Sequence, residues 1–348
     1  MINDYQLFND IIKDKKVLHI PIYSCFDYQS GLLNFKADGN INRFLTTWYY
    51  VNQYSSLSIF CPQNGNNIDW FCNSIKNELH DINLIFTPFI KKSAKIERSI
   101  QFAKDFILYY NNIFDSVDYI VVESQHLYQQ LELQGYYDKL IYWCPVCAIE
   151  NKTRDFLEPY KEFDRYLINH TKYLIVASNE QVEYAKTLRK NDIIQINSLI
   201  DRSLNFFNYE IDENIYNQLI KNNNTKIFLP FRLTDEGYKM KEIFKELFNY
   251  YLLNKEFIVY YSNPNNCDIY KLLNPDNKFS IKNFLDNYFI QVSKNRNTYY
   301  TILDYGNVII PYLEDINFIA HASVSEFETS KKCKVISSLD KLYDTIIN

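Results

Sequence analysis

Short apolar runs and amphipathic segments alternate along most of this 348-residue chain. The apolar runs are rich in β-branched and aromatic residues, and polar residues or proline bound them. Apolar strands that alternate with helices are typical of a parallel sheet covered on both faces, so the pattern predicts an α/β protein. In the first part of the chain, the predicted strands span residues 15–23, 55–62, 82–89, 118–124, 139–146, 172–178 and 192–200.

A second series of predicted strands begins after a polar stretch near residues 205–225. Its members span residues 226–231, 255–262, 286–292, 306–312 and 333–338. The longest predicted helix lies between the third and fourth strands of the first series, within residues 91–114. Its apolar face consists of Ile96, Ile100, Ala103, Phe106 and Ile107. Because the strand series restarts, we expect two Rossmann-like domains, residues 1–205 and 206–348, that face each other across a cleft.

Composition narrows the class of protein. The chain is long enough for two ordinary cores, and its net charge of -5 disfavours a protein that binds nucleic acid over its whole surface. Seven scattered cysteines suit reduced thiols. The N-terminus lacks the zones of a signal peptide, and no apolar run approaches the roughly 20 residues of a membrane span. We therefore expect a soluble, cytoplasmic protein.

A glycine-bearing stretch, residues 24–44, follows the first predicted strand. Open α/β sheets bind ligands at the carboxyl ends of their strands. Gly31 and Gly39 would let the backbone approach a ligand closely, and Asp27 or Asp38 could act as a base. The stretch has no GxGxxG pattern, which disfavours a dinucleotide-dependent dehydrogenase. A long surface loop is the alternative to a ligand-binding loop.

The spacing of the cysteines and histidines does not indicate a metal site. Cys144 and Cys147 form one CxxC without a second pair or nearby histidines, so we predict packing or loop residues rather than a zinc site. His19 lies within an apolar strand and is predicted to be a core residue with its hydrogen bonds satisfied. His321 lies near acidic residues and is the best histidine for a substrate contact.

A basic cluster of Lys91, Lys92, Lys95 and Arg98 lies at the start of the longest predicted helix. A solvated helix face is the default interpretation. An electrostatic site for a phosphate-rich acceptor such as DNA is the alternative.

Arg232 ends a predicted strand, and Lys239 lies in or beside the first turn of the helix predicted after it. A helix N-terminus attracts phosphate through its N–H groups and its dipole. An arginine fork and a lysine point charge add to that attraction. The pair could therefore hold a diphosphate. Alternatively, Arg232 forms a structural ion pair with Asp235 or Glu236.

Carboxylates gather near the C-terminus. Glu314 and Asp315 follow a predicted strand, and Glu326 and Glu328 lie in a helix-like segment before the last predicted strand. A carboxylate at a helix start can accept hydrogen bonds from both hydroxyls of a ribose or a sugar. Surface acids without a ligand are the alternative.

With these two segments, the chain resembles nucleotide-sugar glycosyltransferases of the GT-B fold. The stretch FLPFRLTDEGYKMKEIF is similar to the start of that family's donor domain, which implies that Arg232 and Lys239 hold the donor diphosphate. The stretch SVSEFETSKKCKVI resembles the segment whose glutamate binds the donor ribose or sugar. That match implies Glu326, with Glu328 as the second choice.

The resemblance implies a hexosyltransferase that moves a sugar from a nucleoside diphosphate sugar, such as a UDP-sugar, to an acceptor hydroxyl. It implies no metal and no cofactor, and an acceptor site mainly in the N-terminal domain, with Asp27 or Asp38 as base if the reaction inverts. The acceptor is a glycan or, as in bacteriophage-type enzymes that work in the host cytoplasm, a hydroxymethylated DNA base. An α/β protein that binds a nucleotide or sugar without turnover is the alternative from another class.

Overall fold

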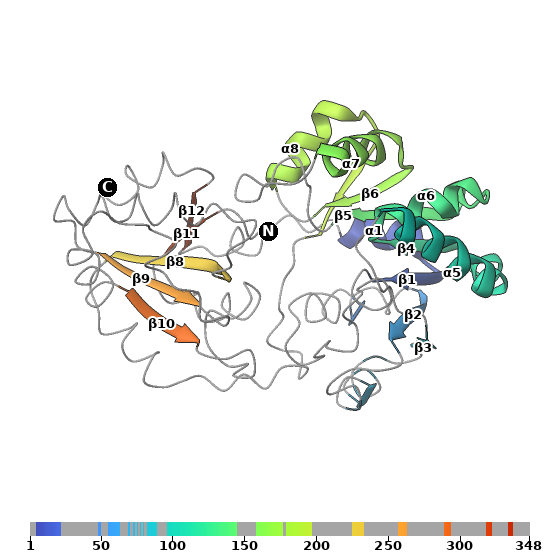
Figure 1. Ribbon diagram of the computed structural model, residues 1–348, viewed down its shortest axis with the longest axis horizontal. Helices are drawn as coiled ribbons and strands as arrows, with labels where there is room; N and C mark the ends of the chain where they lie inside the picture. Colours follow the sequence, from blue (N-terminus) through green and yellow to red (C-terminus); the bar gives the residue numbers. More distant parts are fainter. Residues whose placement is uncertain are drawn as a thin grey trace. The chain divides into compact units, whose positions relative to one another are not determined.

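The computed structural model describes the chain in two compact units, one of residues 1–150 and 157–206, the other of residues 151–156 and 207–348 (Figure 1). The described residues are 5–21, 55–62, 82–88, 96–144, 158–176 and 179–196, single positions between 48 and 79, and the backbone of the strands between residues 225 and 336. The boundary at residue 205 and the cleft stay predictions.

A seven-stranded sheet, with all its strand pairs parallel, forms the centre of the first unit. Its order is β3-β2-β1-β4-β5-β6-β7. The strands are β1 (Lys16–Ile20), β2 (Ser56–Pro62), β3 (Asn83–Thr87), β4 (Tyr119–Val122), β5 (Leu140–Cys144), β6 (Tyr173–Val176) and β7 (Ile193–Gln195). Each falls within a predicted strand, so the first series is confirmed with shorter bounds.

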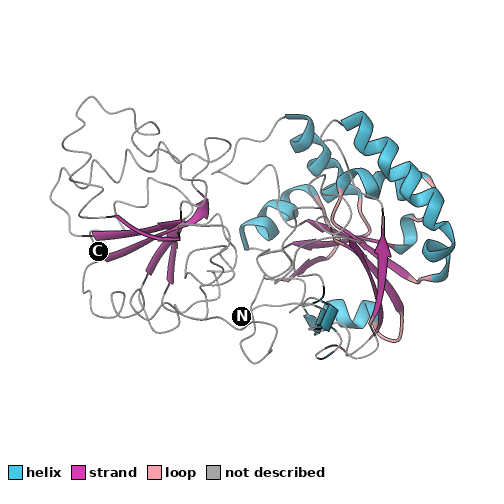
Figure 2. Cartoon of the chain, turned by 60° about the horizontal axis from the view of Figure 1, so that its bottom comes forward, coloured by secondary structure: helices cyan, strands magenta, loops and turns pink. Residues whose placement is uncertain are grey.

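Helices flank this sheet, as Figure 2 shows. They are α1 (Tyr5–Ile12), α5 (Ile96–Ser116), α6 (Gln125–Leu133), α7 (Glu158–His170) and α8 (Asn179–Leu188), with a short 3-10 helix η2 (Tyr137–Lys139). The predicted long helix is confirmed as α5, and its Ala103, Phe106 and Ile107 are buried. Ser124 caps α6, because its side-chain oxygen accepts a hydrogen bond from the Leu127 N–H.

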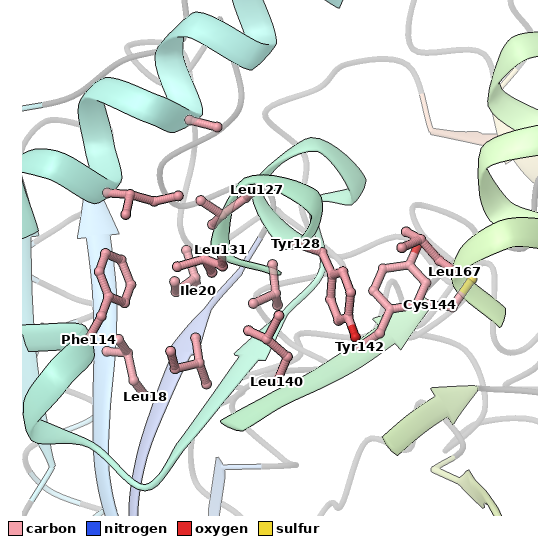
Figure 3. Close-up of a cluster of buried hydrophobic side chains, with 14 of the residues drawn as sticks. Leu18, Ile20, Phe114, Leu127, Tyr128, Leu131, Leu140, Tyr142, Cys144 and Leu167 are labelled. Atoms are coloured by element: carbon pink, nitrogen blue, oxygen red, sulfur yellow. The ribbon is translucent and has the colours of Figure 1, made fainter. Parts of the chain in front are cut away.

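One hydrophobic cluster fills the space between the sheet and helices α5, α6 and α7. Leu127 and Leu131 of α6 belong to this cluster, together with Ile20 of β1 and Leu140 of β5 (Figure 3). Full burial of such a side chain stabilises the fold by roughly 1.5–3 kcal/mol. Successive strand residues point to opposite faces, so His19, between Leu18 and Ile20, lies on the other face of the sheet.

The second unit contains a five-stranded parallel sheet of order β10-β9-β8-β11-β12. Its strands are β8 (Thr225–Arg232), β9 (Phe257–Ser262), β10 (Phe289–Ser293), β11 (Phe318–His321) and β12 (Cys333–Ile336). Four of the five overlap predicted strands. The sequence did not predict β11, because a strand of four residues is too short to show a period-2 pattern. The strand predicted at 306–312 lies outside the described residues.

In both sheets, the side on which successive strands are added changes once. In the first unit, β2 and β3 extend the sheet on one side of β1, and β4 returns to its other side. In the second unit, β9 and β10 extend it on one side of β8, and β11 returns to the other. Such a switch point, at the carboxyl ends of the two central strands, is where open α/β sheets bind their ligands. The fold therefore indicates two candidate ligand-binding positions, one at β1/β4 and one at β8/β11.

Candidate functional site

The switch point of the second unit carries two residues that the sequence singled out. Arg232 is the last residue of β8, where it pairs with Ser262 at the end of β9 after a shift in the strand register. The prediction that Arg232 ends a strand is thereby confirmed. His321 is the last residue of β11, the neighbour of β8 on its other side. A cationic and a titratable residue thus occupy the edge of the sheet at which ligands bind.

The remaining predicted site residues lie outside the described residues, and their roles stay predictions. They are Asp27, Gly31, Asp38, Gly39, Lys91, Lys92, Lys239, Glu314, Asp315, Glu326 and Glu328. Of the basic cluster, Arg98 is the member with a described side chain, and it is exposed on α5.

The switch point of the first unit holds a buried histidine and a buried carboxyl group. His19 is the penultimate residue of β1, and Glu123 follows directly after β4. Nε2 of His19 lies 3.1 Å from Oε1 of Glu123, and each residue is 2% exposed. The in-register pair His19 and Val121 places the two strands side by side at this point. The contact therefore joins residues 104 positions apart in the sequence.

Two tryptophans enclose the imidazole ring of His19. Nε1 of Trp48 donates a hydrogen bond of 2.6 Å to Nδ1 of His19, with the two rings edge to face at 81°. Trp143 of β5 stacks on the ring, with centroids 5.5 Å apart and planes 13° from parallel. The prediction of His19 as a satisfied core residue is confirmed, because both ring nitrogens have partners.

Glu123 is the residue that sequence reasoning missed. The available signal was a glutamate at the carboxyl end of a buried apolar strand, in YIVVES, directly before the N-cap serine of a helix. A carboxyl group that is taken from water without hydrogen bonds is costly, so its bond to His19 explains how this position is tolerated. A buried carboxyl group at a switch point is also a candidate for proton transfer.

A second buried carboxyl group, Asp164 of α7, lies on the core side of the same sheet. It accepts hydrogen bonds from Gln125 Nε2 and, at 3.4 Å, from the hydroxyl of Tyr142. These bonds tie α6, α7 and β5 together around a fully buried aspartate. We assign the cluster a structural role, since it links three elements within the hydrophobic core.

Cys144, at the end of β5, is fully buried. This confirms the packing role predicted for it; Cys147 lies outside the described residues. Across the part of the chain that the structure describes, no three histidine, cysteine or acidic residues are grouped closely enough to hold a metal ion. Among the same residues, no helix has the length and apolar character needed to cross a membrane.

The chain is similar in fold to several solved structures, among them a sucrose-phosphate synthase and a protein described as a glycosyltransferase. Sucrose-phosphate synthase from Thermosynechococcus elongatus matches 96% of this chain and 89% of its own, with 10% identity and a TM-score of 0.56. A glycosyltransferase from Rickettsia africae matches 96% and 87%, with 14% identity and a TM-score of 0.52. The Anabaena protein HepE, solved with UDP-glucose, matches 96% and 89%, with 13% identity and a TM-score of 0.51.

No protein-family model matches the chain, and no curated protein matches it in sequence. The structural likeness spans nearly the whole chain at very low identity, so it establishes the fold. The chain has the two-domain α/β architecture of GT-B glycosyltransferases. This confirms the predicted fold class. Function has to be argued from the residues at the two switch points.

Proposed function

We propose that this protein is a metal-independent glycosyltransferase that moves a sugar from a nucleoside diphosphate sugar to an acceptor hydroxyl. The position of Arg232 carries the proposal. It ends the central strand of the second sheet, at the switch point where an open α/β sheet binds a ligand. An arginine there suits a diphosphate, since its guanidinium group binds phosphate oxygens in a bidentate manner.

In the proposed reaction, the bond between the anomeric carbon and the diphosphate breaks, and its electron pair leaves with the diphosphate. The acceptor oxygen forms the new bond to the anomeric carbon and gives its proton to a base of the first unit. Arg232 and Lys239 stabilise the negative charge that develops on the departing diphosphate. Glu326 or Glu328 binds the ribose or sugar hydroxyls, with Glu314 and Asp315 nearby in sequence.

Two kinds of support come from outside the sequence. The fold is similar to that of a protein described as a glycosyltransferase, and another protein with a similar fold, HepE, was solved with UDP-glucose. We therefore take UDP-sugars as the first donors to test. The acceptor in this proposal is a glycan hydroxyl, bound mainly by the first unit.

A thermal-shift screen with UDP, GDP and ADP tests donor binding. A ligand at about a hundred times its Kd stabilises the folded chain by about 2.7 kcal/mol, which raises its melting temperature measurably. Failure of all three diphosphates to raise the melting temperature would sink the donor assignment. Release of UDP from UDP-glucose in the presence of glycans then tests turnover. Donor binding without release would instead identify a nucleotide-sugar-binding protein.

The DNA alternative has its own experiment. A gel shift with plain and hydroxymethylated DNA, run over a series of salt concentrations, separates the two acceptors. A DNA-modifying enzyme of the bacteriophage type binds with a steep salt dependence, because contacts to phosphates release counterions. Such a slope, with sugar transferred to the modified base, would replace the glycan by DNA as acceptor.

A further inference from the structure

Three strands of the second sheet end level with one another. β8 ends at Arg232, β9 at Ser262 and β10 at Ser293. Ser262 pairs with Arg232 on one side and with Ser293 on the other. Adjacent strands lie about 4.8 Å apart, so the three residues follow one another along the carboxyl edge of the sheet. This is the edge at which open α/β sheets bind ligands.

The register between β8 and β9 breaks just before this edge. Leu229 pairs with Tyr261 and continues the regular register of the preceding residues. The next residue of β9, Ser262, pairs with Arg232 instead of residue 230. Residues 230–231 are therefore extra in β8, as the additional residue is in a β-bulge. In an unbroken register, Arg232 would lie two residues, or about 6.6 Å, past the level of Ser262.

The register between β9 and β10 breaks at the same step of β9. Gln291 of β10 pairs with Tyr261, and Ser293 pairs with Ser262, so Val292 is extra in β10. An unbroken sheet would set an apolar residue on each side of Ser262. The two breaks set polar residues there, so they change the chemistry of this edge and not only its shape.

Pro230 gives the break in β8 a local cause. β8 has a neighbour on each side, β9 and β11. Proline has no N–H for the ladder and its ring fixes φ, so between two neighbours it is found essentially at bulges. The pairs that β8 forms with β11 involve Ile227 and Phe228, both of which precede Pro230. The break is therefore encoded in the sequence of β8 itself.

We infer that Pro230 is a positioning residue for Arg232. It ends the regular ladder of β8 and so places Arg232 level with Ser262. The inference rests on the proposed function, in which Arg232 binds the diphosphate of the donor at this edge. A guanidinium group binds phosphate oxygens through two parallel hydrogen bonds, so its position matters more than that of a point charge. A shift of several ångströms would remove this geometry and leave the arginine in the chain.

Titration calorimetry of the full chain with UDP tests the inference, using substitutions that separate position from stability. Valine favours a regular strand, whereas glycine weakens a strand but suits a bulge. We expect Pro230→Val to weaken UDP binding by roughly 10- to 100-fold, the effect of losing hydrogen bonds to a charged group. Pro230→Gly should weaken it less. A purely structural role of Pro230 predicts the reverse order, because valine is the better strand former.

A double-mutant cycle tests whether Pro230 acts through Arg232. Arg232→Ala should weaken UDP binding by a similar factor, and Pro230→Val should add little to that loss in the same chain. Ile227→Val is the matched control, since Ile227 lies in the regular part of β8, and its UDP affinity should equal that of the wild type. Circular dichroism and melting temperature establish that each variant is folded. Pro230→Ala, which also restores the N–H, takes the place of Pro230→Val if that variant does not fold.

The outcomes separate the inference from the proposed function. Wild-type affinity in Pro230→Val would reject Pro230 as a positioning residue and leave Arg232 in the donor site. A loss that is as large without Arg232 as with it would do the same, because Pro230 would then act on the sheet alone. A wild type that binds none of UDP, GDP and ADP would reject the proposed function, and the inference with it.

Discussion

The hydrogen bond from Trp48 Nε1 to His19 Nδ1, 2.6 Å long, joins two residues that bracket the stretch 24–44. Because that stretch follows the first strand, the sequence offers it as a ligand-binding loop, with a long surface loop as the alternative. Both bracketing residues are buried on one face of the first sheet, at 3% and 2% exposure. The bond therefore joins two described residues that lie on either side of that stretch in the sequence.

Loss of this bond should lower the free energy of unfolding. Trp48→Phe removes the indole N–H and deprives a buried imidazole nitrogen of that donor, which costs about 1–3 kcal/mol. Urea denaturation followed by circular dichroism measures the change in the free energy of unfolding. Tyr109→Phe is the control, since Tyr109 is 65% exposed and its change should stay within about 0.5 kcal/mol. Equal effects of both variants would contradict the structural role of the bond.

Arg189 directly follows α8, and its side chain binds the C-terminal end of α7. Its guanidinium donates to the carbonyl oxygens of Ile168 at 3.0 Å and Lys172 at 3.1 Å, and its Nε donates to that of Asn191 at 3.3 Å. The residue is 6% exposed, and this burial lowers the pKa of its guanidinium. The bonds to Ile168 and Lys172 hold the last turn of α7 and the loop after it, and the bond to Asn191 holds the loop after α8.

Arg189→Met should therefore destabilise the first unit by about 1.5–3 kcal/mol, because it strands carbonyl oxygens that the guanidinium now satisfies. The midpoint of urea unfolding measures the effect. Lys190→Met is the matched control, because the neighbouring Lys190 is exposed and carries the same formal charge. A loss of stability in Lys190→Met as large as in Arg189→Met would show that charge, not the buried bonds, is responsible.

The strands of the first series could be predicted because each contains a short apolar run, as expected for the strands of a covered parallel sheet. β4, for example, is YIVV, with its last three residues buried. β11 could not, since Phe318–His321 is too short to show a period. Its place beside β8 comes from the pairing of Ile319 with Ile227, which no local pattern encodes.

The same distinction between local patterns and long-range contacts applies to the residues of the candidate site. Arg232 could be found because the strand, the cation and the turn after it lie together in one short stretch. The row of Trp48, His19 and Glu123 could not, since its contacts span 29 and 104 positions of the sequence. They arise only when β4 returns to the side of β1, so the strand order has to be known first.

Alkaline pH should destabilise the first unit. Burial, the hydrogen bond to Asp115 and the negative charge of Asp115 raise the pKa of Tyr136 from 10.0 to about 12. Between these values the folded chain keeps a proton that the unfolded chain has released, so the free energy of unfolding falls as the pH rises through this window. Burial also raises the pKa values of Tyr128, Tyr119 and Tyr166, which act in the same direction.

Urea unfolding at a series of pH values above about 9 measures this slope. Tyr136→Phe should make it shallower, and Asp115→Asn should do so partly, because it removes the charge but keeps an oxygen that can accept the hydrogen bond. An unchanged slope in Tyr136→Phe would exclude this phenol as a source of the alkaline effect.

Removal of divalent metal should leave sugar transfer intact. In the proposed reaction, the side chains Arg232 and Lys239 balance the charge of the leaving diphosphate, a task that metal ions perform in other phosphoryl-group enzymes. UDP release is measured before and after dialysis against EDTA, and again with magnesium restored. Loss of turnover in EDTA that magnesium restores would reject the metal-independent mechanism while keeping the transfer reaction.

The role of Arg232 can be tested within its own strand. Arg232→Ala should lower kcat by about 10²- to 10³-fold, the typical effect of removing one group that stabilises a developing charge. Arg232→Lys should recover only part of the rate, because an ammonium group keeps the charge but not the bidentate geometry. Lys226→Ala is the matched control, since Lys226 lies near the amino end of β8, away from the edge where ligands bind. If Arg232→Ala and Lys226→Ala had the same rate as the wild type, the diphosphate site would have to lie elsewhere than the β8/β11 switch point.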